Sequence, residues 1–164
     1  MSVTIREAEA RDRARLIDLY QALNQHEDGV TGDRRTDRAA AEENLDSTAA
    51  RLVGCGGVML VAETGDRVVG FLALTFEADG VYVRPERRAH AHITELAVEA
   101  ACRRQGIGAA LMAAAERIAV ERGHSRLTIS VMAGNREAEA AYARQGFRPL
   151  AHDLEKAIGE PGDS

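Results

Sequence analysis

Cysteine and lysine are almost absent from this sequence. Cys55 and Cys102 are the only cysteines in 164 residues, and Lys156 is the only lysine. The cysteines have no nearby partner at metal-ligand spacing, so we expect two reduced thiols, no disulfide and no metal. Because arginine does not titrate near neutral pH, covalent mechanisms that depend on a lysine amine are also disfavoured.

Long apolar runs are lacking as well. Charged residues from Arg6 to Asp12 interrupt the N-terminal segment, and no later stretch is long enough to cross a bilayer. The net charge is −5 with both signs mixed along the chain, which argues against affinity for nucleic acid. We therefore expect a cytoplasmic protein whose partner is a small molecule or a peptide, with no membrane association.

The length of the chain sets the number of domains. A chain of 164 residues that is 45 % hydrophobic can bury one core and is too short for two ordinary domains. We expect a single domain over residues 1–158, followed by a disordered tail over residues 159–164.

Hydrophobic periodicity predicts alternating strands and helices. The predicted strands are Val3–Arg6, Val58–Ala62, Val68–Phe76, Ala91–Val98, Arg126–Val131 and Phe147–His152. The predicted helices are Arg11–Asn24, Asp37–Leu52, Gly106–Arg122 and Asn135–Gln145, and the polar segment Gln25–Arg38 is expected to be a loop. A glycine-containing turn at Thr64–Arg67 predicts an antiparallel hairpin, whereas parallel pairing is expected in the C-terminal half. This order indicates an α/β fold with a mixed sheet.

The segment from Leu96 to Met112 is the most informative part of the chain, because a strand passes through a short loop into an apolar-faced helix. The first N–H groups of a helix lack intrahelical acceptors and carry the positive end of the helix dipole. The amides from Gln105 to Ala109 therefore offer an anion site. Gly106 and Gly108 have no Cβ, which lets a phosphate approach the backbone.

Arg103 and Arg104 add positive charge beside this predicted anion site. An ordinary flexible helix start would show the same pair of glycines. A dinucleotide fingerprint would need a third glycine where Leu111 stands, and a Gly-Lys-Ser/Thr phosphate loop is absent. The pattern therefore favours a pyrophosphate carried by another kind of ligand.

Two motifs together resemble the GCN5-related N-acetyltransferase (GNAT) family. Arg103–Gly108 matches the family's Arg/Gln-x-x-Gly-x-Gly/Ala loop, and Asn135–Phe147 resembles its Asn-x-x-Ala-x-x-x-Tyr-x-x-x-Gly-Phe segment. The resemblance is strong over residues 91–147. It departs from the family pattern at Ala100, where a proline is frequent, and at Cys102, where an aromatic residue is frequent.

The resemblance implies one acetyltransferase domain with a mixed, mostly antiparallel sheet of about six strands and about four flanking helices. A V-shaped opening in the sheet would admit acetyl-CoA as the acetyl donor, and no metal would be needed. Asn135 could cap its helix, contact the cofactor, or do both. The residues implied to bind the cofactor are Leu96, Ala97, Val98, Arg103, Arg104, Gln105, Gly106, Ile107, Gly108, Ala109, Asn135 and Tyr142.

The resemblance also implies catalytic roles. Tyr142 matches the tyrosine that protonates the departing CoA thiolate in many relatives, although it could instead be a core aromatic. Glu95 and His92 are the candidates for the base that takes a proton from the acceptor amine, and Glu95 is preferred. Strand alternation places these two on opposite faces unless a bulge intervenes. His90 and Thr94 are weaker candidates.

The implied function is acetyl-CoA-dependent N-acetylation by direct transfer to a primary amine. The acceptor would be a small molecule, such as an aminoglycoside-like compound, a polyamine or an amino acid, or else a protein. It is expected between Gln25–Arg38 and Glu77–His92, where four acidic residues could attract a cation: Asp28, Asp33, Glu77 and Asp79. A non-catalytic acyl-CoA-binding regulator is the alternative, and a homodimer is possible because family members frequently dimerise.

Overall fold

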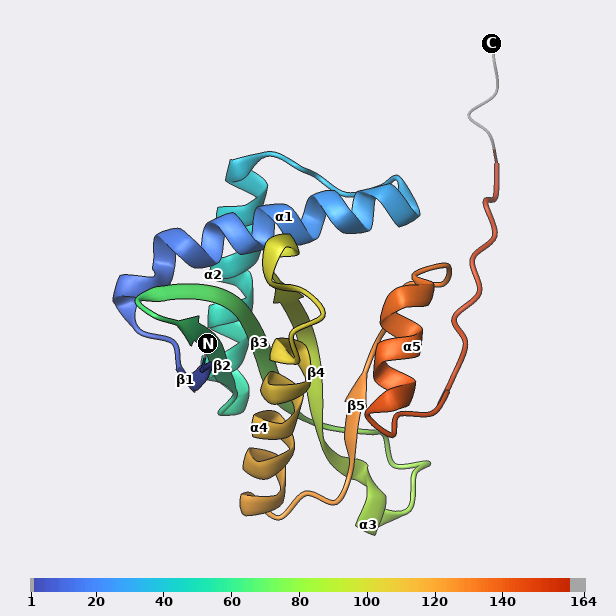
Figure 1. The fold of residues 1–164 in the computed structure, drawn as a ribbon. Helices are drawn as coiled ribbons and strands as arrows, with labels where there is room; N and C mark the ends of the chain where they lie inside the picture. Colours follow the sequence, from blue (N-terminus) through green and yellow to red (C-terminus); the bar gives the residue numbers. More distant parts are fainter. Residues whose placement is uncertain (1, 160–164) are drawn as a thin grey trace.

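A five-stranded sheet lies at the centre of the protein (Figure 1). The structure is a computed structural model, and it describes residues 2–159. The strands are β1 (Thr4–Glu7), β2 (Val58–Thr64), β3 (Arg67–Ala78), β4 (Ala89–Val98) and β5 (Leu127–Ile129), in that spatial order. The first four are antiparallel to their neighbours and β5 is parallel to β4, so the sheet is mixed and mostly antiparallel as predicted.

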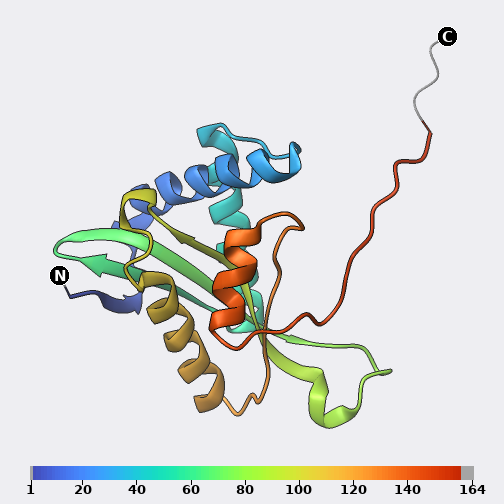
Figure 2. The same ribbon diagram turned by 45° about the vertical axis from the view of Figure 1, so that its right-hand side comes forward.

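Helices cover both faces of the sheet (Figure 2). α1 (Arg13–Thr31) and α2 (Arg38–Cys55) pack on one face, α4 (Ile107–Glu121) packs on the other, and α5 (Arg136–Arg144) contributes Tyr142 to the α4 side. The short helix α3 (Pro85–Arg88) precedes β4, and 3₁₀ turns occupy Ala10–Asp12 and Ala100–Cys102.

The alternation of side chains along β3 divides the interior into two cores. Leu72 and Leu74 point toward Leu111 of α4, whereas Phe71 points toward Tyr20 of α1. All four of the apolar side chains Tyr20, Phe71, Leu72 and Leu74 are fully buried. Burial of side chains of this size contributes about 1.5–3 kcal/mol each, so both helical layers are held firmly on the sheet.

The predicted loop Gln25–Arg38 is largely helical. α1 continues to Thr31 and ends where Gly32 adopts a left-handed conformation with φ 71°. The connection to α2 is only residues 32–37, and the Asp37 side chain accepts the Ala40 N–H at 2.9 Å to cap α2. Polar residues on an exposed helix face give no apolar periodicity, and this is why the sequence pattern suggested a loop.

The strand predicted at Phe147–His152 is wrong. Residues 148–159 have no regular secondary structure and are exposed, and they run away from the body of the protein (Figures 1 and 2). The Phe147 N–H is already bonded to the Tyr142 carbonyl, and Pro149 has no N–H to give to a ladder. The tail prediction falls mostly on residues 160–164, which lie outside the described residues.

The sheet opens between β4 and β5. Their pairing runs from Ala91↔Leu127 to Ile93↔Ile129, where β5 ends. β4 continues for five more residues, so the edge of Thr94–Val98 on that side has no neighbouring strand among the described residues. This divergence corresponds to the V-shaped opening that the family resemblance implied.

Candidate functional site

A β-bulge shapes β4 beside the opening. Glu95 pairs with Ala73 and Ile93 pairs with Leu74, which leaves Thr94 without a partner across the ladder. Because one extra residue shifts the alternation, His92 and Glu95 lie on the same face of the sheet, toward α1 and α2. The bulge therefore brings together the two candidate bases that simple alternation would separate.

Glu95 accepts hydrogen bonds from two hydroxyl groups. The Tyr20 hydroxyl of α1 donates to Oε2 at 2.7 Å, and the Thr48 hydroxyl of α2 lies 3.0 Å from Oε1 and 3.1 Å from Oε2. Burial raises the pKa of the Glu95 carboxyl, while the two hydrogen bonds act in the opposite direction. Raising a carboxyl pKa toward neutrality suits a general base.

His92 lies on the same face as Glu95 and is held by β5. Its Nδ1 is 2.7 Å from the Thr128 hydroxyl oxygen, and that hydroxyl lies 3.5 Å from the Ala91 carbonyl oxygen. If Thr128 donates to Ala91, Nδ1 carries the proton and Nε2 is left as an acceptor; this tautomer is inferred from the hydrogen bonds. Burial lowers the pKa of His92, against the attraction of Glu77, and this favours the neutral ring.

A cluster of polar side chains lies beside His92 on strands β3 and β4. Thr75 and Arg51 both donate to Glu77 Oε1. His90 is buried, with Nε2 4.0 Å from Glu77 Oε2. Burial opposes ionisation of Glu77, but the Thr75 hydrogen bond and the charge of Arg51 lower its pKa overall. Glu77 is therefore an anion that is already neutralised by its neighbours.

The loop before α4 has the geometry of an anion site. Arg104 and Gly106 adopt left-handed conformations with φ 61° and 80°, and the first helical bond runs from the Ala110 N–H to the Gly106 carbonyl. Within residues 2–159, the three preceding amides, of Ile107, Gly108 and Ala109, have no protein acceptor. A Cβ at Gly108 would meet only Val98 Cγ2, at 3.9 Å, so this side of the turn is open.

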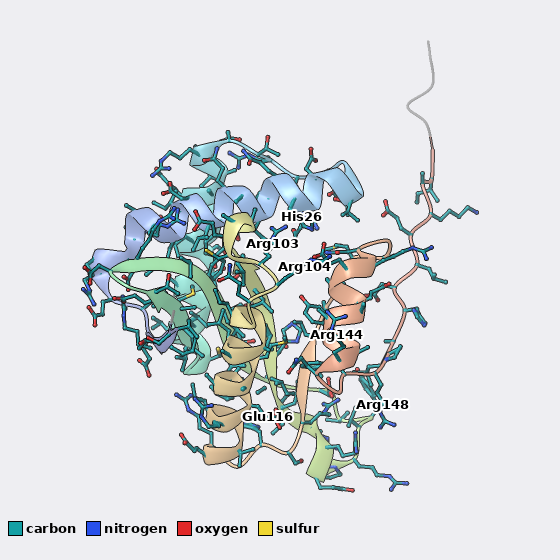
Figure 3. All side chains as sticks on the ribbon, in the orientation of Figure 1. His26, Arg103, Arg104, Glu116, Arg144 and Arg148 are labelled. Atoms are coloured by element: carbon teal, nitrogen blue, oxygen red, sulfur yellow. The ribbon has the colours of Figure 1, made fainter. Side chains whose placement is uncertain are left out.

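The predicted cofactor residues lie around this loop and the opening. Leu96, Ala97 and Val98 form the half-buried end of β4, beyond its pairing with β5. Arg103 Nε donates to the Val98 carbonyl at 3.2 Å, and Arg104 is exposed and 3.9 Å from Glu137 of α5. Figure 3 shows both arginines near the N-terminal end of α4. The structure thus brings the predicted phosphate loop next to the first turn of α5.

Asn135 and Tyr142 belong to α5. The Asn135 side chain accepts the Ala138 N–H at 3.3 Å, which confirms its role as a helix cap. Tyr142 is half-buried, and its ring meets Phe147 edge-on with 6.1 Å between centroids. Its hydroxyl has no hydrogen-bond partner in the part of the chain that the structure describes. Burial, with a smaller contribution from the charge of Glu27, raises the pKa of Tyr142 and keeps the hydroxyl protonated near neutral pH.

The four acidic residues predicted to attract a cation are already engaged. Asp28 accepts the backbone N–H of Arg34, Asp33 pairs with the Arg34 guanidinium, Glu77 pairs with Arg51, and Asp79 pairs with Arg126. Glu27 was not predicted, yet its charge acts on both Glu95 and Tyr142. Because Glu27 lies on the stretch misread as a loop, its helical placement was not visible in the sequence.

Arg34 connects the α1–α2 turn to the loop before α5. Its guanidinium is 3.1 Å from Glu27 and 3.7 Å from the Met132 sulfur. A Cβ at Gly134 would lie 3.9 Å from Val30 Cγ1, which also places the end of α1 beside that loop. The two segments, far apart in sequence, therefore lie side by side.

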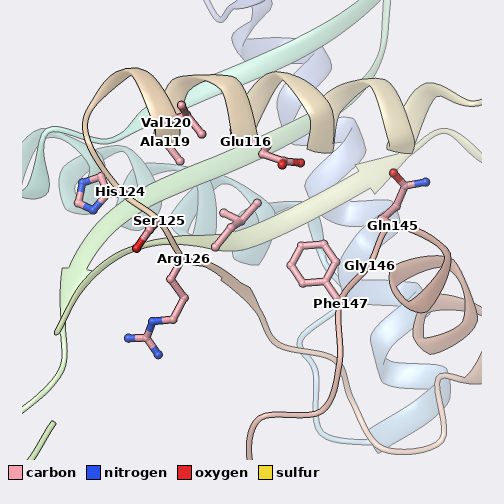
Figure 4. Close-up of a pocket in the computed structure, with 10 residues that line it drawn as sticks. Glu116, Ala119, Val120, His124, Ser125, Arg126, Gln145, Gly146 and Phe147 are labelled. Carbon is pink, nitrogen blue, oxygen red and sulfur yellow. The ribbon is translucent and has the colours of Figure 1, made fainter. Parts of the chain in front are cut away.

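A cavity of about 210 Å³ lies elsewhere, at the C-terminal end of α4 (Figure 4). It contains none of the predicted site residues. Its lining comes from α4, the following turn, β5 and the end of α5: Glu116, Ala119, Val120, His124, Ser125, Arg126, Leu127, Gln145, Gly146 and Phe147. The candidate base Glu95 lies instead on β4 at the opening, and the amides without a protein acceptor lie at the start of α4, after β4.

Comparison with known proteins identifies a family and several similar folds. The sequence model described as "Acetyltransferase (GNAT) family" matches residues 14–147. Comparison with curated proteins by sequence gives no significant match.

None of the described helices is long and apolar enough to cross a membrane. Within the described residues, no three His, Cys, Asp or Glu side chains are grouped as a metal site would require.

Three solved structures illustrate the likeness in fold. A transcriptional regulator from Bacillus halodurans C-125 is 23% identical with a TM-score of 0.74, and the match covers 96% of this chain and 100% of that chain. An aminoglycoside 6'-N-acetyltransferase from Acinetobacter haemolyticus is 14% identical with a TM-score of 0.70, covering 96% and 99%. An aminoglycoside N-acetyltransferase in complex with CoA is 14% identical with a TM-score of 0.74, covering 96% and 95%.

Proposed function

The chain belongs to the GNAT family of acetyltransferases, and on this premise we propose that it is an acetyl-CoA-dependent N-acetyltransferase. The acetyl group would pass directly to a primary amine, without a covalent acetyl-enzyme. The observation that carries the proposal is the position of Glu95 and His92 on β4, where β5 diverges. We place the candidate acid Tyr142 and the unbonded amides of Ile107–Ala109 at the same opening.

The residues of the opening fit acetyl-CoA. The free amides from Ile107 to Ala109 and the flanking Arg103 and Arg104 suit a pyrophosphate, and the unpaired edge of Leu96–Val98 suits an extended pantetheine arm with its amides. Gln105, Asn135 and Tyr142 complete the proposed contacts. A similar structure that contains CoA supports this choice of ligand. When bound, acetyl-CoA supplies an acetyl group activated as a thioester.

The side chains divide the proton transfers between them. Glu95, or His92 through its Nε2, would accept a proton from the ammonium form of the acceptor and so free its lone pair for attack. A backbone N–H on the unpaired part of β4 would stabilise the developing oxyanion. Tyr142 has a raised pKa and a hydroxyl without a protein partner, so it would hold the proton that the leaving sulfur needs.

The acceptor side favours a cation. The charge of Glu27 on α1 acts on Glu95 of β4. Arg34 pairs with both Glu27 and Asp33, so these three side chains together carry a net negative charge. We propose a small-molecule primary amine as the acceptor, such as an aminoglycoside-like compound, a polyamine or an amino acid, with a protein amine as the other option. The two aminoglycoside acetyltransferases of similar fold are consistent with the first group.

The proposal is tested by thiol release from acetyl-CoA in the presence of a panel of amines. The panel would contain aminoglycosides, polyamines, amino acids and peptides, with product mass confirming an added acetyl group on nitrogen. We expect one class to give turnover well above hydrolysis. Tight acetyl-CoA binding with no thiol release across the panel would overturn catalysis. That result would favour a non-catalytic acyl-CoA-binding regulator, an option raised by the transcriptional regulator of similar fold.

We further propose that the enzyme acts in the cytoplasm as a homodimer. Leu150, Leu154 and Ile158 are 71%, 95% and 84% exposed on the extended C-terminal segment. Large apolar side chains exposed together on one segment are typical of a protein contact surface. A second copy of the chain is the partner that would cover them without another component.

A further inference from the structure

Two buried hydroxyl groups from different helices converge on one carboxylate. Tyr20 is 0% exposed and Thr48 is 7% exposed, and both hydroxyls reach Glu95 within 3.1 Å. Tyr20 comes from α1, Thr48 from α2 and Glu95 from β4, so three separate elements meet at this point. The arrangement depends on how both helices pack on the sheet.

Packing alone does not account for the two hydroxyls. The Tyr20 ring stacks on Phe71 with 4.5 Å between centroids, a contact that phenylalanine would make equally well. A threonine within a helix can bond the carbonyl four residues earlier, as Thr31 does with Glu27. Thr48 instead turns its hydroxyl to Glu95. Burying a hydroxyl without a partner is unfavourable, so both groups are matched to the carboxylate.

We propose that Tyr20 and Thr48 are positioning residues that hold Glu95 ionised and oriented as the proton acceptor for the amine. This inference rests on the proposed function. Both hydroxyls donate to the carboxylate form and counteract the burial that favours the neutral acid. The carboxylate has about four acceptor positions, so two donors leave room for an ammonium group or a water molecule.

Other charged residues around Glu95 shift its pKa in both directions. Glu27 of α1 raises the pKa of Glu95 and Arg51 of α2 lowers it, while His92 lies on the same face of β4. In the reaction, an N–H bond of the acceptor ammonium breaks, its proton moves to a Glu95 oxygen directly or through one water, and the nitrogen keeps the electron pair. Loss of either hydroxyl donor would make the carboxylate more basic and leave it protonated over a wider pH range.

The test compares Tyr20→Phe and Thr48→Val with the native enzyme. The pKa of Glu95 is followed by NMR of the labelled side-chain carboxyl carbon, with the signal assigned through Glu95→Gln. The pH profile of kcat/KM is measured in parallel with the best amine. Each substitution should raise the Glu95 pKa by about one unit, because a hydrogen bond to a charged group has roughly that strength. The acidic limb of the profile should move to higher pH by the same amount.

Matched controls separate this effect from a loss of structure. Thr48→Ser keeps a hydroxyl and should restore the native limb, while Tyr82→Phe removes a phenol hydroxyl from a side chain that is 88% exposed and should change nothing. Thermal unfolding reports any loss of stability separately. The acceptor's own titration is common to all variants, so only a difference between variants is assigned to Glu95.

The outcomes distinguish this inference from the proposed function. An unchanged Glu95 pKa in both variants overturns the role of the hydroxyls, whether or not the enzyme is active. A raised pKa with an unmoved kcat/KM limb overturns Glu95 as the proton acceptor and with it the positioning role. If no amine is acetylated, the proposed function fails. The positioning role then falls as well, because it rests on that function. This holds even if the NMR titration shows that the two hydroxyls set the pKa of the Glu95 carboxyl.

Discussion

At the scale of single residues, burial shifts the pKa values of the two candidate bases toward each other. Burial raises the pKa of the Glu95 carboxyl and lowers the pKa of the His92 imidazole. The same physical cause has opposite effects, because burial disfavours the charged form of each group and the charged forms differ. The sheet face toward α1 and α2 therefore carries the two groups that we propose for proton transfer, and of these Glu95 accepts hydrogen bonds from two hydroxyl groups.

Tyr142→Phe should lower kcat by roughly 10²-fold, the lower range of general-acid catalysis, with little change in acetyl-CoA affinity. The ring would still pack edge-on against Phe147, so the fold should be kept. Stopped-assay turnover and calorimetric binding are measured together. Tyr82→Phe serves as the exposed control. An unaltered rate across the pH range would exclude Tyr142 as the acid.

At the scale of elements, the decisive feature is the start of α4. The left-handed turn at Arg104 and Gly106 brings the chain into the helix, and within residues 2–159 the amides from Ile107 to Ala109 have no protein acceptor. Glycine adopts this conformation without the cost that a side chain imposes at Arg104. This start of α4 concentrates partial positive charge where β4 ends and near the first turn of α5.

Gly108→Glu should weaken acetyl-CoA binding at least about 100-fold, because a carboxylate would face the phosphate position and displace charge-assisted hydrogen bonds. Gly108 does not have a left-handed backbone, and its Cβ would have only one neighbour, at 3.9 Å, so the helix should still form. Calorimetric titration measures the affinity.

The matched control for this prediction is Gly54→Glu. Gly54 is exposed within α2 and has nothing within 4 Å of a built Cβ, so the same charge is added far from the opening. If Gly108→Glu binds acetyl-CoA as tightly as the native protein does, the proposed placement of the cofactor is contradicted.

At the scale of the whole molecule, the C-terminal segment and the opening lie in different parts of the structure. Residues 148–159 extend past α5 and away from the sheet (Figure 1). Within the described residues, β5 pairs only with β4, so the far edge of β5 has no paired strand. Association of two chains would bury apolar side chains of the segment without closing the opening on β4.

Leu154→Asp should convert a dimer into a monomer, because it would place a charge in the apolar contact. Light scattering after size-exclusion chromatography measures the mass. Val53→Asp is the control, since Val53 is 86% exposed on α2, away from the C-terminal segment. A native protein of one-chain mass, or a variant that remains dimeric, would contradict the proposed assembly.

The sequence by itself determined the features that depend on neighbouring residues. The hairpin, the helix after the paired glycines and the cap at Asn135 follow from local turn chemistry and periodicity, and each was predicted close to its observed bounds. Helix α1 was cut short and a final strand was added, because polar helical turns and short apolar runs give weak local signals.

Only the tertiary structure decided which side chains share the opening. Tyr20 and Thr48 lie 75 and 47 residues from Glu95 in the chain. No local sequence pattern predicts that either hydroxyl donates a hydrogen bond to this carboxylate. The bulge at Thr94 depends on the register of β4 against β3, which reverses the face that simple alternation gives to Glu95. Local chemistry specified the loop that we propose for phosphate binding, whereas the grouping of the proposed proton-transfer residues required the packed sheet and helices.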